Sequence, residues 1–129
     1  MKALIVDDAK VVRVALGRIM NQLGYETVTA ENGLEALEQM EAHPDTDVVM
    51  LDWNMPVMNG YDFLVAMRED SRFGNSPKVI MVTTETGMGS MMKALAAGAD
   101  EYIMKPFDRE MVSGKLMMIG LEVSDPGSE

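Results

Sequence analysis

Residues 48–60 read VVMLDWNMPVMNG, and this stretch indicates the fold most directly. Its first part, Val48–Leu51, has the length of a strand and is apolar at every position. A strand of that kind is buried on both faces, as in a parallel sheet covered by helices. The run ends at Asp52, and the residues after Gly60 show helical spacing. The stretch therefore predicts a strand, a loop and a helix, with an acidic residue at the carboxyl end of the strand.

The same unit recurs on both sides of this stretch. Other apolar runs of strand length are Ala3–Val6, Thr27–Thr29, Val79–Val82 and Tyr102–Met104. Helical spacing predicts helices over residues 11–23, 32–42, from 60 onward, 87–97 and 108–120. Five successive βα units predict a parallel sheet with helices on both faces and right-handed crossovers. The predicted fold class is therefore α/β, a flavodoxin-like (βα)5 doubly wound parallel sheet in strand order 2-1-3-4-5.

Length and composition set limits on the class of protein. The 129 residues, 47% of them hydrophobic, suit one domain, which we expect over 1–121 with a flexible C-terminal tail at 122–129. The apolar start, Ala3–Val6, is too short for a signal peptide or a membrane span. The absence of cysteine excludes disulfides and suits the cytoplasm, where we expect a monomer. A net charge of -10 argues against nucleic acid as a direct partner.

Charged and polar residues stand directly after four of the predicted strands. They are Asp7, Asp8, Asp52, Thr83 and Lys105. Carboxyl ends of parallel strands share one edge of a sheet, so these side chains are expected to lie together. Three neighbouring carboxylates repel one another unless a cation shares the space, and Mg²⁺ suits such oxygen ligands. A carboxylate can also attack phosphorus, and a metal and a lysine would neutralise the transferred group. A single Asp after a strand is usually a turn or cap residue, so the joint arrangement carries the prediction.

Four motifs at these strand ends make the chain similar to the receiver domains of bacterial response regulators. They are LIVDD at 4–8, MLDWNMPVMNG at 50–60, VTT at 82–84 and YIMKPF at 102–107. The resemblance covers about residues 1–121 and implies that Asp52 accepts a phosphoryl group from a histidine kinase, with Mg²⁺ as cofactor. The implied metal ligands are Asp7, Asp8, Asp52 and the backbone carbonyl of Asn54.

The resemblance also implies how the switch is completed. Lys105 would pair with the phosphoryl group, Thr83 would move to hydrogen-bond it, and Tyr102 would turn inward. The Lys105–Pro106 peptide is expected to be cis. Such a domain promotes its own phosphorylation and dephosphorylation. We therefore expect a signalling switch without turnover of an outside substrate, and not an enzyme in that sense.

Asn54 and Glu85 are the pair found in the chemotaxis members of this family. In that resemblance the two positions flank the path of the attacking water, which predicts a phosphoryl group lasting seconds to minutes. Thr84 is a departure, because smaller residues are common there and a larger one would narrow access. The output surface is expected on the two last predicted helices and the strand between them. There Met91 and Leu95, near Tyr102, would dock a protein target such as a flagellar motor component.

Three other interpretations remain open. The chain could be a phosphorelay intermediate that passes its phosphoryl group to a histidine phosphotransfer protein. It could also be the receiver part of a longer regulator, which the polar end of the sequence permits. A flavodoxin-like cofactor-binding enzyme is a candidate from another class. Against it, Asp7 and Asp8 follow the first strand where a glycine-rich phosphate loop would be needed.

Overall fold

The computed structural model describes residues 1–85 and 87–124, which include five parallel strands in one sheet. These are β1 (Lys2–Val6), β2 (Glu26–Ala30), β3 (Val48–Leu51), β4 (Lys78–Thr83) and β5 (Glu101–Met104). Their spatial order is β2-β1-β3-β4-β5, which confirms the flavodoxin-like topology expected from the sequence. Strand β3 has the expected bounds. The other strands extend one residue further at one or both ends, because backbone pairing continues past the apolar run.

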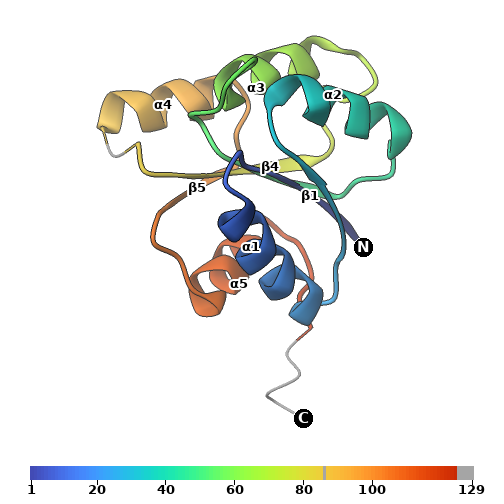
Figure 1. Ribbon diagram of the computed structural model, residues 1–129, viewed down its shortest axis with the longest axis vertical. Coiled ribbons are helices and arrows are strands. Elements are labelled where there is room, and N and C mark those ends of the chain that lie inside the picture. The colour runs from blue at the N-terminus through green and yellow to red at the C-terminus, as the bar shows by residue number, and fades with distance from the viewer. Residues whose placement is uncertain (86, 125–129) are drawn as a thin grey trace.

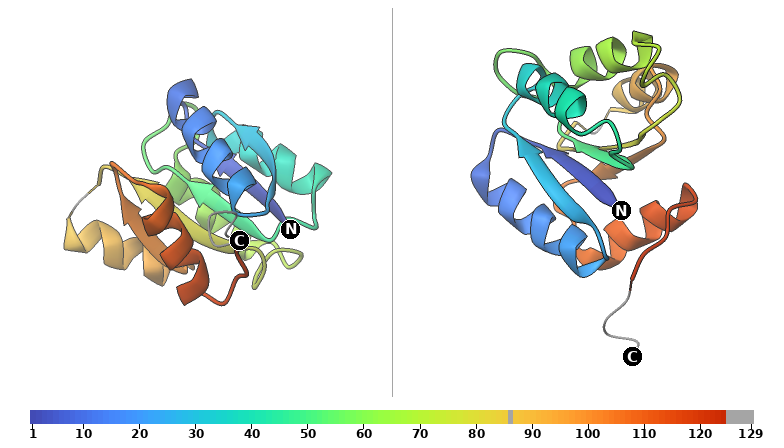
Figure 2. Two further views of the ribbon diagram at one scale, coloured as in Figure 1. Left: turned by 90° about the horizontal axis from the view of Figure 1, so that it is seen from below. Right: turned by 90° about the vertical axis from the view of Figure 1, so that its right-hand side faces the viewer.

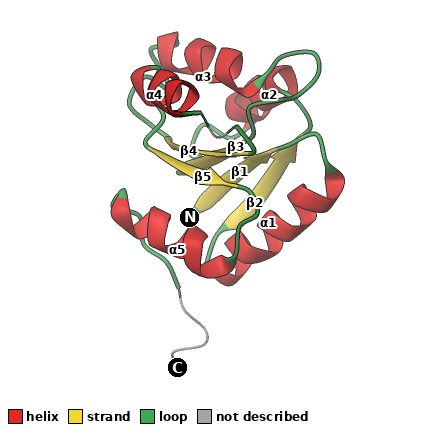
Figure 3. Ribbon diagram, turned by 90° about the vertical axis from the view of Figure 1, so that its left-hand side faces the viewer, coloured by secondary structure: helices red, strands yellow, loops and turns green. Residues whose placement is uncertain are grey.

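Five helices within the described residues connect and follow the strands. They are α1 (Lys10–Gln22), α2 (Gly33–Ala42), α3 (Gly60–Glu69), α4 (Met88–Ala96) and α5 (Arg109–Met118). Helices α2, α3 and α4 cover one face of the sheet, and α1 and α5 cover the other (Figures 1 and 3). The left view of Figure 2 shows α1 and α5 side by side in front of the strands. None of the helices described has the length and apolar character needed to cross a membrane.

Side-chain alternation along the strands divides the core into two layers. On β1, Leu4 and Val6 join the cluster under α2, α3 and α4, while Ala3 and Ile5 join the cluster under α1 and α5. All four are at most 1% exposed. This is why the central strands are apolar at every position and lack the alternation of a sheet with one wet face.

Side-chain caps fix where three of the helices begin. Asn32, Asn59 and Asp108 each accept a hydrogen bond from the backbone amide three residues later, at 2.8 Å in every case. Such a cap satisfies one of the amides that the first helical turn leaves unpaired. The cap at Asn59 is the important one for function, because it sets the start of α3 directly behind the end of β3.

The first residues of the expected C-terminal tail contact the body of the protein. The hydroxyl of Tyr25 donates to the Glu122 carbonyl oxygen at 2.9 Å, and the Ser124 amide donates to the Leu23 carbonyl oxygen at 2.8 Å. Val123 packs against the core cluster under α1 and α5. Residues 125–129, the rest of the expected tail, lie outside the described residues.

Candidate metal and phosphorylation site

Strand pairing places the acidic residues of two neighbouring strands side by side. Strands β1 and β3 are parallel neighbours, and the Asp52 amide donates to the Val6 carbonyl oxygen at 2.9 Å. Asp7 and Asp52 therefore leave the sheet at the same edge. Next to them, the Lys105 amide donates to the Thr83 carbonyl oxygen at 2.9 Å, which joins the ends of β4 and β5. The backbone alone thus brings four of the predicted site residues together.

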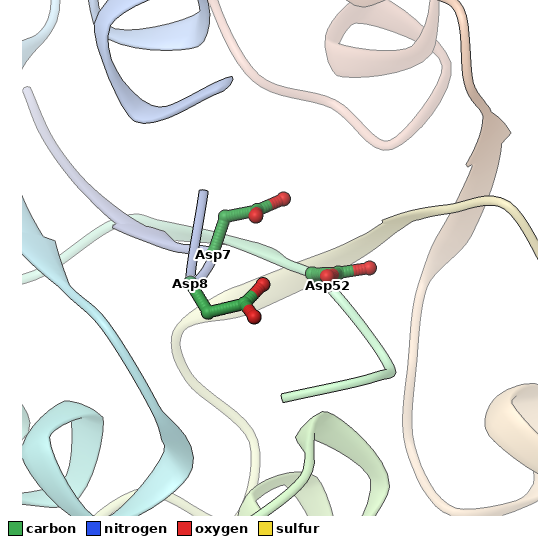
Figure 4. A group of neighbouring side chains, drawn as sticks. All are labelled: Asp7, Asp8 and Asp52. Carbon is green, nitrogen blue, oxygen red and sulfur yellow. The ribbon is translucent and has the colours of Figure 1, made fainter. Parts of the chain in front are cut away.

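Three carboxylates gather at this edge. Asp7, Asp8 and Asp52 each have a carboxylate oxygen within 4.8 Å of the others (Figure 4). Asp7 is 2% exposed and Asp52 6% exposed, whereas Asp8 is exposed, so the cluster opens to solvent on one side. Backbone amides orient the two buried carboxylates. The Ala9 amide donates to Asp7 Oδ1 and the Trp53 amide to Asp52 Oδ1, both at 2.9 Å.

One ammonium group faces the buried carboxylates. Lys105 Nζ donates to Asp7 Oδ2 at 2.8 Å and lies 3.6 Å from Asp52 Oδ1. The Lys105–Pro106 peptide is cis. Burial raises the pKa of Asp52 and the charge of Asp7 adds to this, while Lys105 acts in the opposite direction. A single ammonium opposes three carboxylates, so the cluster stays strongly negative.

The donor set fits a hard divalent cation. Mg²⁺ prefers carboxylate oxygens and keeps several of its waters, and the exposed side at Asp8 leaves room for them. A cation also removes the repulsion between Asp7 and Asp52 that raises the pKa of the latter. The three carboxylates expected to hold Mg²⁺ therefore occupy one site. The backbone carbonyl of Asn54 as a further ligand stays a prediction.

The two expected switch residues, Thr83 and Tyr102, bind the two polar groups of the Glu85 backbone. Thr83 is fully buried, and its hydroxyl oxygen accepts a hydrogen bond from the Glu85 amide at 3.2 Å. Tyr102 is 5% exposed and points inward, and its hydroxyl donates to the Glu85 carbonyl oxygen at 2.8 Å. Burial raises the pKa of Tyr102, and the charges of Glu85 and Asp52 add to the shift. Both side chains thus hold the backbone of Glu85, two residues after the end of β4.

The residues expected to tune dephosphorylation lie above this edge. Asn54 Nδ2 donates to Glu85 Oε1 at 2.9 Å, so the expected pair is in direct contact across the gap between the β3–α3 and β4–α4 loops. Thr84, between the switch threonine and Glu85, is exposed. Their effect on phosphoryl lifetime stays a prediction.

The two expected output residues on α4 differ in exposure. Met91 is half-buried and packs against the core cluster that includes Tyr102, and its contact with a target stays a prediction. Its neighbour Met92 is 64% exposed, and Leu95 is 42% exposed. The reason is the phase of the helix. Ala94 takes the fully buried position, which turns Met91, three residues earlier, inward and Met92 outward.

Two residues that support the site were not singled out from the sequence as doing so. Arg13 donates from Nη1 to the Asp7 carbonyl oxygen at 2.8 Å and forms an ion pair with Glu31 at 3.5 Å. The only sequence signal is a basic residue in the first helical turn after an acidic pair. At Gly60 an added Cβ would collide with the Asp52 carbonyl oxygen and lie 2.9 Å from its carbonyl carbon. That glycine was expected only as the start of a helix.

Comparison with known proteins identifies the class of this chain. Residues 3–116 match the response regulator receiver domain, and the chain belongs to that family. Receiver domains are switches of two-component phosphorelay signalling, and not enzymes that turn over an outside substrate.

Named relatives narrow the comparison. The chain is 45% identical to the chemotaxis protein CheY1 of Helicobacter pylori over 120 residues, which are 92% of this chain and 96% of that protein. It is 38% identical to the chemotaxis protein CheY homolog of Campylobacter jejuni over 117 residues, 90% of this chain and 89% of the relative.

Solved structures agree with this placement. Chemotaxis response regulator CheY4 of Vibrio cholerae has a TM-score of 0.84 at 35% identity, covering 92% of this chain and 97% of that chain. A chain of the CheX–CheY–BeF3–Mg complex from Borrelia burgdorferi has a TM-score of 0.87 at 31% identity, covering 95% of this chain and 90% of its own.

Proposed function

We propose that this protein is a chemotaxis-type response regulator switched by Mg²⁺-dependent phosphorylation of Asp52. One observation carries the proposal. Three carboxylate oxygens lie within 4.8 Å of one another, and Lys105 Nζ contacts the two buried carboxylates at 2.8 and 3.6 Å. A buried carboxylate with a cation site on one side and an ammonium on the other is an arrangement suited to accept a phosphoryl group. The relatives named as chemotaxis proteins support the chemotaxis part of the proposal.

In the proposed reaction Asp52 acts as the nucleophile. One of its carboxylate oxygens attacks the phosphorus of a phosphohistidine on a histidine kinase, the N–P bond breaks, and the imidazole leaves with the electron pair and takes up a proton. The product is an acyl phosphate on Asp52. Asp7, Asp8 and Asp52 would hold Mg²⁺, which when bound supplies charge neutralisation for the phosphoryl oxygens. Lys105 neutralises the phosphoryl group from the other side and is already within reach.

Dephosphorylation requires one water molecule to attack the phosphorus in line with the bond to Asp52. Attack by water breaks the P–O bond to Asp52, which leaves as the carboxylate. Asn54 and Glu85 are in contact beside this path, and their polar groups can hold the attacking water. We therefore propose a phosphoryl lifetime of seconds to minutes, with Thr84 as the residue that limits access.

The signal would pass through the residues that hold Glu85. A phosphoryl group on Asp52 draws the Thr83 hydroxyl toward it, which releases the Glu85 amide, while Tyr102 in its inward position keeps the Glu85 carbonyl. This is a local charge change that biases the position of Glu85. The face formed by α4, β5 and α5 would then bind the target through exposed methionines. The exposed methionines on these three elements are Met88, Met92, Met104, Met111, Met117 and Met118.

The proposed partners follow from this scheme. A histidine kinase is the phosphodonor, and a protein such as a flagellar motor component is the target. We place the protein in the cytoplasm as a monomer, with no direct contact to nucleic acid or membrane. Residues 1–121 would form the receiver domain.

The experiment that tests the proposal is phosphorylation with acetyl phosphate, followed by intact-protein mass spectrometry. With Mg²⁺ present, the wild type and the control Asp62→Asn, an exposed acid of α3, should each gain one phosphoryl group. Asp52→Asn should gain none, and chelation of Mg²⁺ should abolish labelling of the wild type. Equal labelling of Asp52→Asn and wild type would refute the assignment. Decay after removal of acetyl phosphate gives the lifetime, and a half-life of hours would refute the proposed role of Asn54 and Glu85.

A further inference from the structure

A chain of ring contacts connects the phosphorylation site to α4. The Trp53 amide donates to Asp52 Oδ1 at 2.9 Å. The Trp53 ring stacks on the Tyr61 ring, with centroids 5.5 Å apart and planes 17° from parallel. On α4, Lys93 Nζ lies 4.4 Å from the centroid of the same tyrosine ring. Helices α3 and α4, which carry Tyr61 and Lys93, lie side by side on the same face of the sheet (Figures 1 and 3).

This chain is independent of the contacts through Thr83 and Tyr102. Those two residues hold the backbone of Glu85, before the start of α4. The ring contacts reach α4 in its middle, at Lys93, and from the opposite loop, the one that follows β3. The ring contacts therefore reach α4 itself, whereas the contacts of Thr83 and Tyr102 end at Glu85.

Backbone hydrogen bonds hold the two residues whose rings stack, Trp53 and Tyr61. Trp53 is fixed by its carbonyl oxygen, which accepts a hydrogen bond from the Gly60 amide at 2.8 Å, and Tyr61 is the next residue along α3. The cap at Asn59 holds the first turn of α3 in place. Lys93, in contrast, lies on the exposed side of α4. A shift of α4 against α3 would therefore change the ammonium–ring distance before it changed the stacking of Trp53 on Tyr61.

We propose that Tyr61 and Lys93 are positioning residues that link occupancy of the phosphorylation site to the position of α4. Lys93 on α4 holds the Tyr61 ring, and that ring holds the Trp53 ring. The Trp53 amide in turn holds the Asp52 carboxylate. The proposal rests on the proposed function, because it needs Asp52 to be the phosphorylated residue. A phosphoryl group on Asp52 binds best when Trp53 keeps its place, and the ammonium on the tyrosine ring stabilises that arrangement. The contact and the phosphoryl group are thermodynamically linked, so loss of the ammonium–ring contact weakens binding of a phosphoryl group at Asp52.

The test uses beryllofluoride with Mg²⁺ as the probe, because it reports binding at Asp52 without turnover. Trp53 is the only tryptophan, so its emission follows the site directly. Lys93→Met and Tyr61→Leu should each raise the concentration for half of the emission change about two- to fivefold, the effect of losing one exposed cation–π contact. The double variant should be no worse than the stronger single variant, because both remove the same contact.

Conservative variants separate this role from a merely structural one. Lys93→Arg keeps a cation and Tyr61→Phe keeps the ring, so both should bind the probe as the wild type does. Arg18→Met removes one positive charge from the exposed side of α1 and controls for net charge. Hydrogen exchange gives a second readout. The amides of α4 should gain protection on probe binding in the wild type, and less in Lys93→Met and Tyr61→Leu.

The outcomes distinguish this proposal from the proposed function. If Lys93→Met binds the probe as Arg18→Met does, or if Lys93→Arg is as weak as Lys93→Met, the link through Tyr61 and Lys93 is refuted while phosphorylation of Asp52 stands. If the wild type itself shows no response that depends on Asp52, the proposed function fails, and this inference fails with it. Unfolding in urea, measured for every variant, shows whether a weakened response reflects loss of the fold.

Discussion

Substitution of Gly60 by alanine should damage phosphorylation more than its small size suggests. The added Cβ would lie 2.9 Å from the carbonyl carbon of Asp52 and 3.2 Å from Leu51 Cγ. Carbon atoms settle at about 3.5 to 4.0 Å, so the start of α3 and the end of β3 must separate by at least about 0.6 Å. The atom that must yield is backbone, which cannot rotate away as a flexible side chain can.

Two magnitudes follow from that displacement. Overpacking of this kind costs about 1–3 kcal/mol in the free energy of unfolding. Because Asp52 itself is moved, its alignment with the phosphodonor suffers as well. A misplacement of about 1 Å can cost about 100-fold in rate, so we expect phosphorylation by acetyl phosphate to slow about 10- to 100-fold.

The assay compares Gly60→Ala with Gly114→Ala. An added Cβ at Gly114 on α5 meets nothing within 4 Å, so the control should gain about 0.5–1 kcal/mol from helix propensity and keep the wild-type rate. Urea unfolding gives the stabilities and mass spectrometry the phosphorylation rates. A folded Gly60→Ala variant that is phosphorylated within twofold of the wild-type rate would refute the reasoning, because Asp52 would then not depend on the close approach of α3.

Three further predictions concern other parts of the chain. Val57, the only described non-glycine residue with positive φ (69°), is 78% exposed, so Val57→Asn should raise the free energy of unfolding by about 1 kcal/mol in urea titrations. Arg68→Lys should lower the free energy of unfolding by about 2–3 kcal/mol, because lysine cannot reproduce the guanidinium bonds to the carbonyls of Phe73 and Gly98. A loss below about 0.5 kcal/mol would contradict this. Burial raises the pKa of Tyr25 to about 12, so the wild type should lose stability as pH rises from 10 to 12, where the unfolded tyrosine ionises first, and Tyr25→Phe should show a flatter profile.

The fold could be predicted because its signals are local. Val48–Leu51 has the same bounds in sequence and structure, since a short run that is apolar at every position has few alternatives to a buried strand. The grouping of Asp7, Asp52 and Lys105 followed from topology alone, because each stands at the carboxyl end of its own strand. These inferences needed no knowledge of side-chain packing.

What could not be predicted depends on contacts between distant segments. The Arg68 guanidinium binds carbonyls that lie 5 and 30 residues further along the chain. No pattern in the sequence indicates where those carbonyls point. The contacts of residues 122–124 could not be predicted for a similar reason, because one of them is made by the Tyr25 hydroxyl, 97 residues away from the Glu122 carbonyl that it binds. The exposure of Met91 relative to Met92 could not be predicted either, because helix phase decides between two adjacent methionines and a shift of one residue reverses the answer.

The proposed function of Asp52 conflicts with the stability of the fold. A nucleophile must be ionised, yet burial and the Asp7 charge raise the pKa of this carboxyl above its unfolded value. For a carboxyl with a raised pKa, the unfolded chain releases its proton first, so the free energy of unfolding falls as pH rises through that range. At neutral pH the charged site therefore costs stability, and Lys105 offsets only part of the cost. A bound cation would remove the same repulsion and restore the anion in one step. In the proposed function, cation binding, ionisation of Asp52 and recovery of stability would thus be one coupled equilibrium, in which the cation offsets the cost of the charged site.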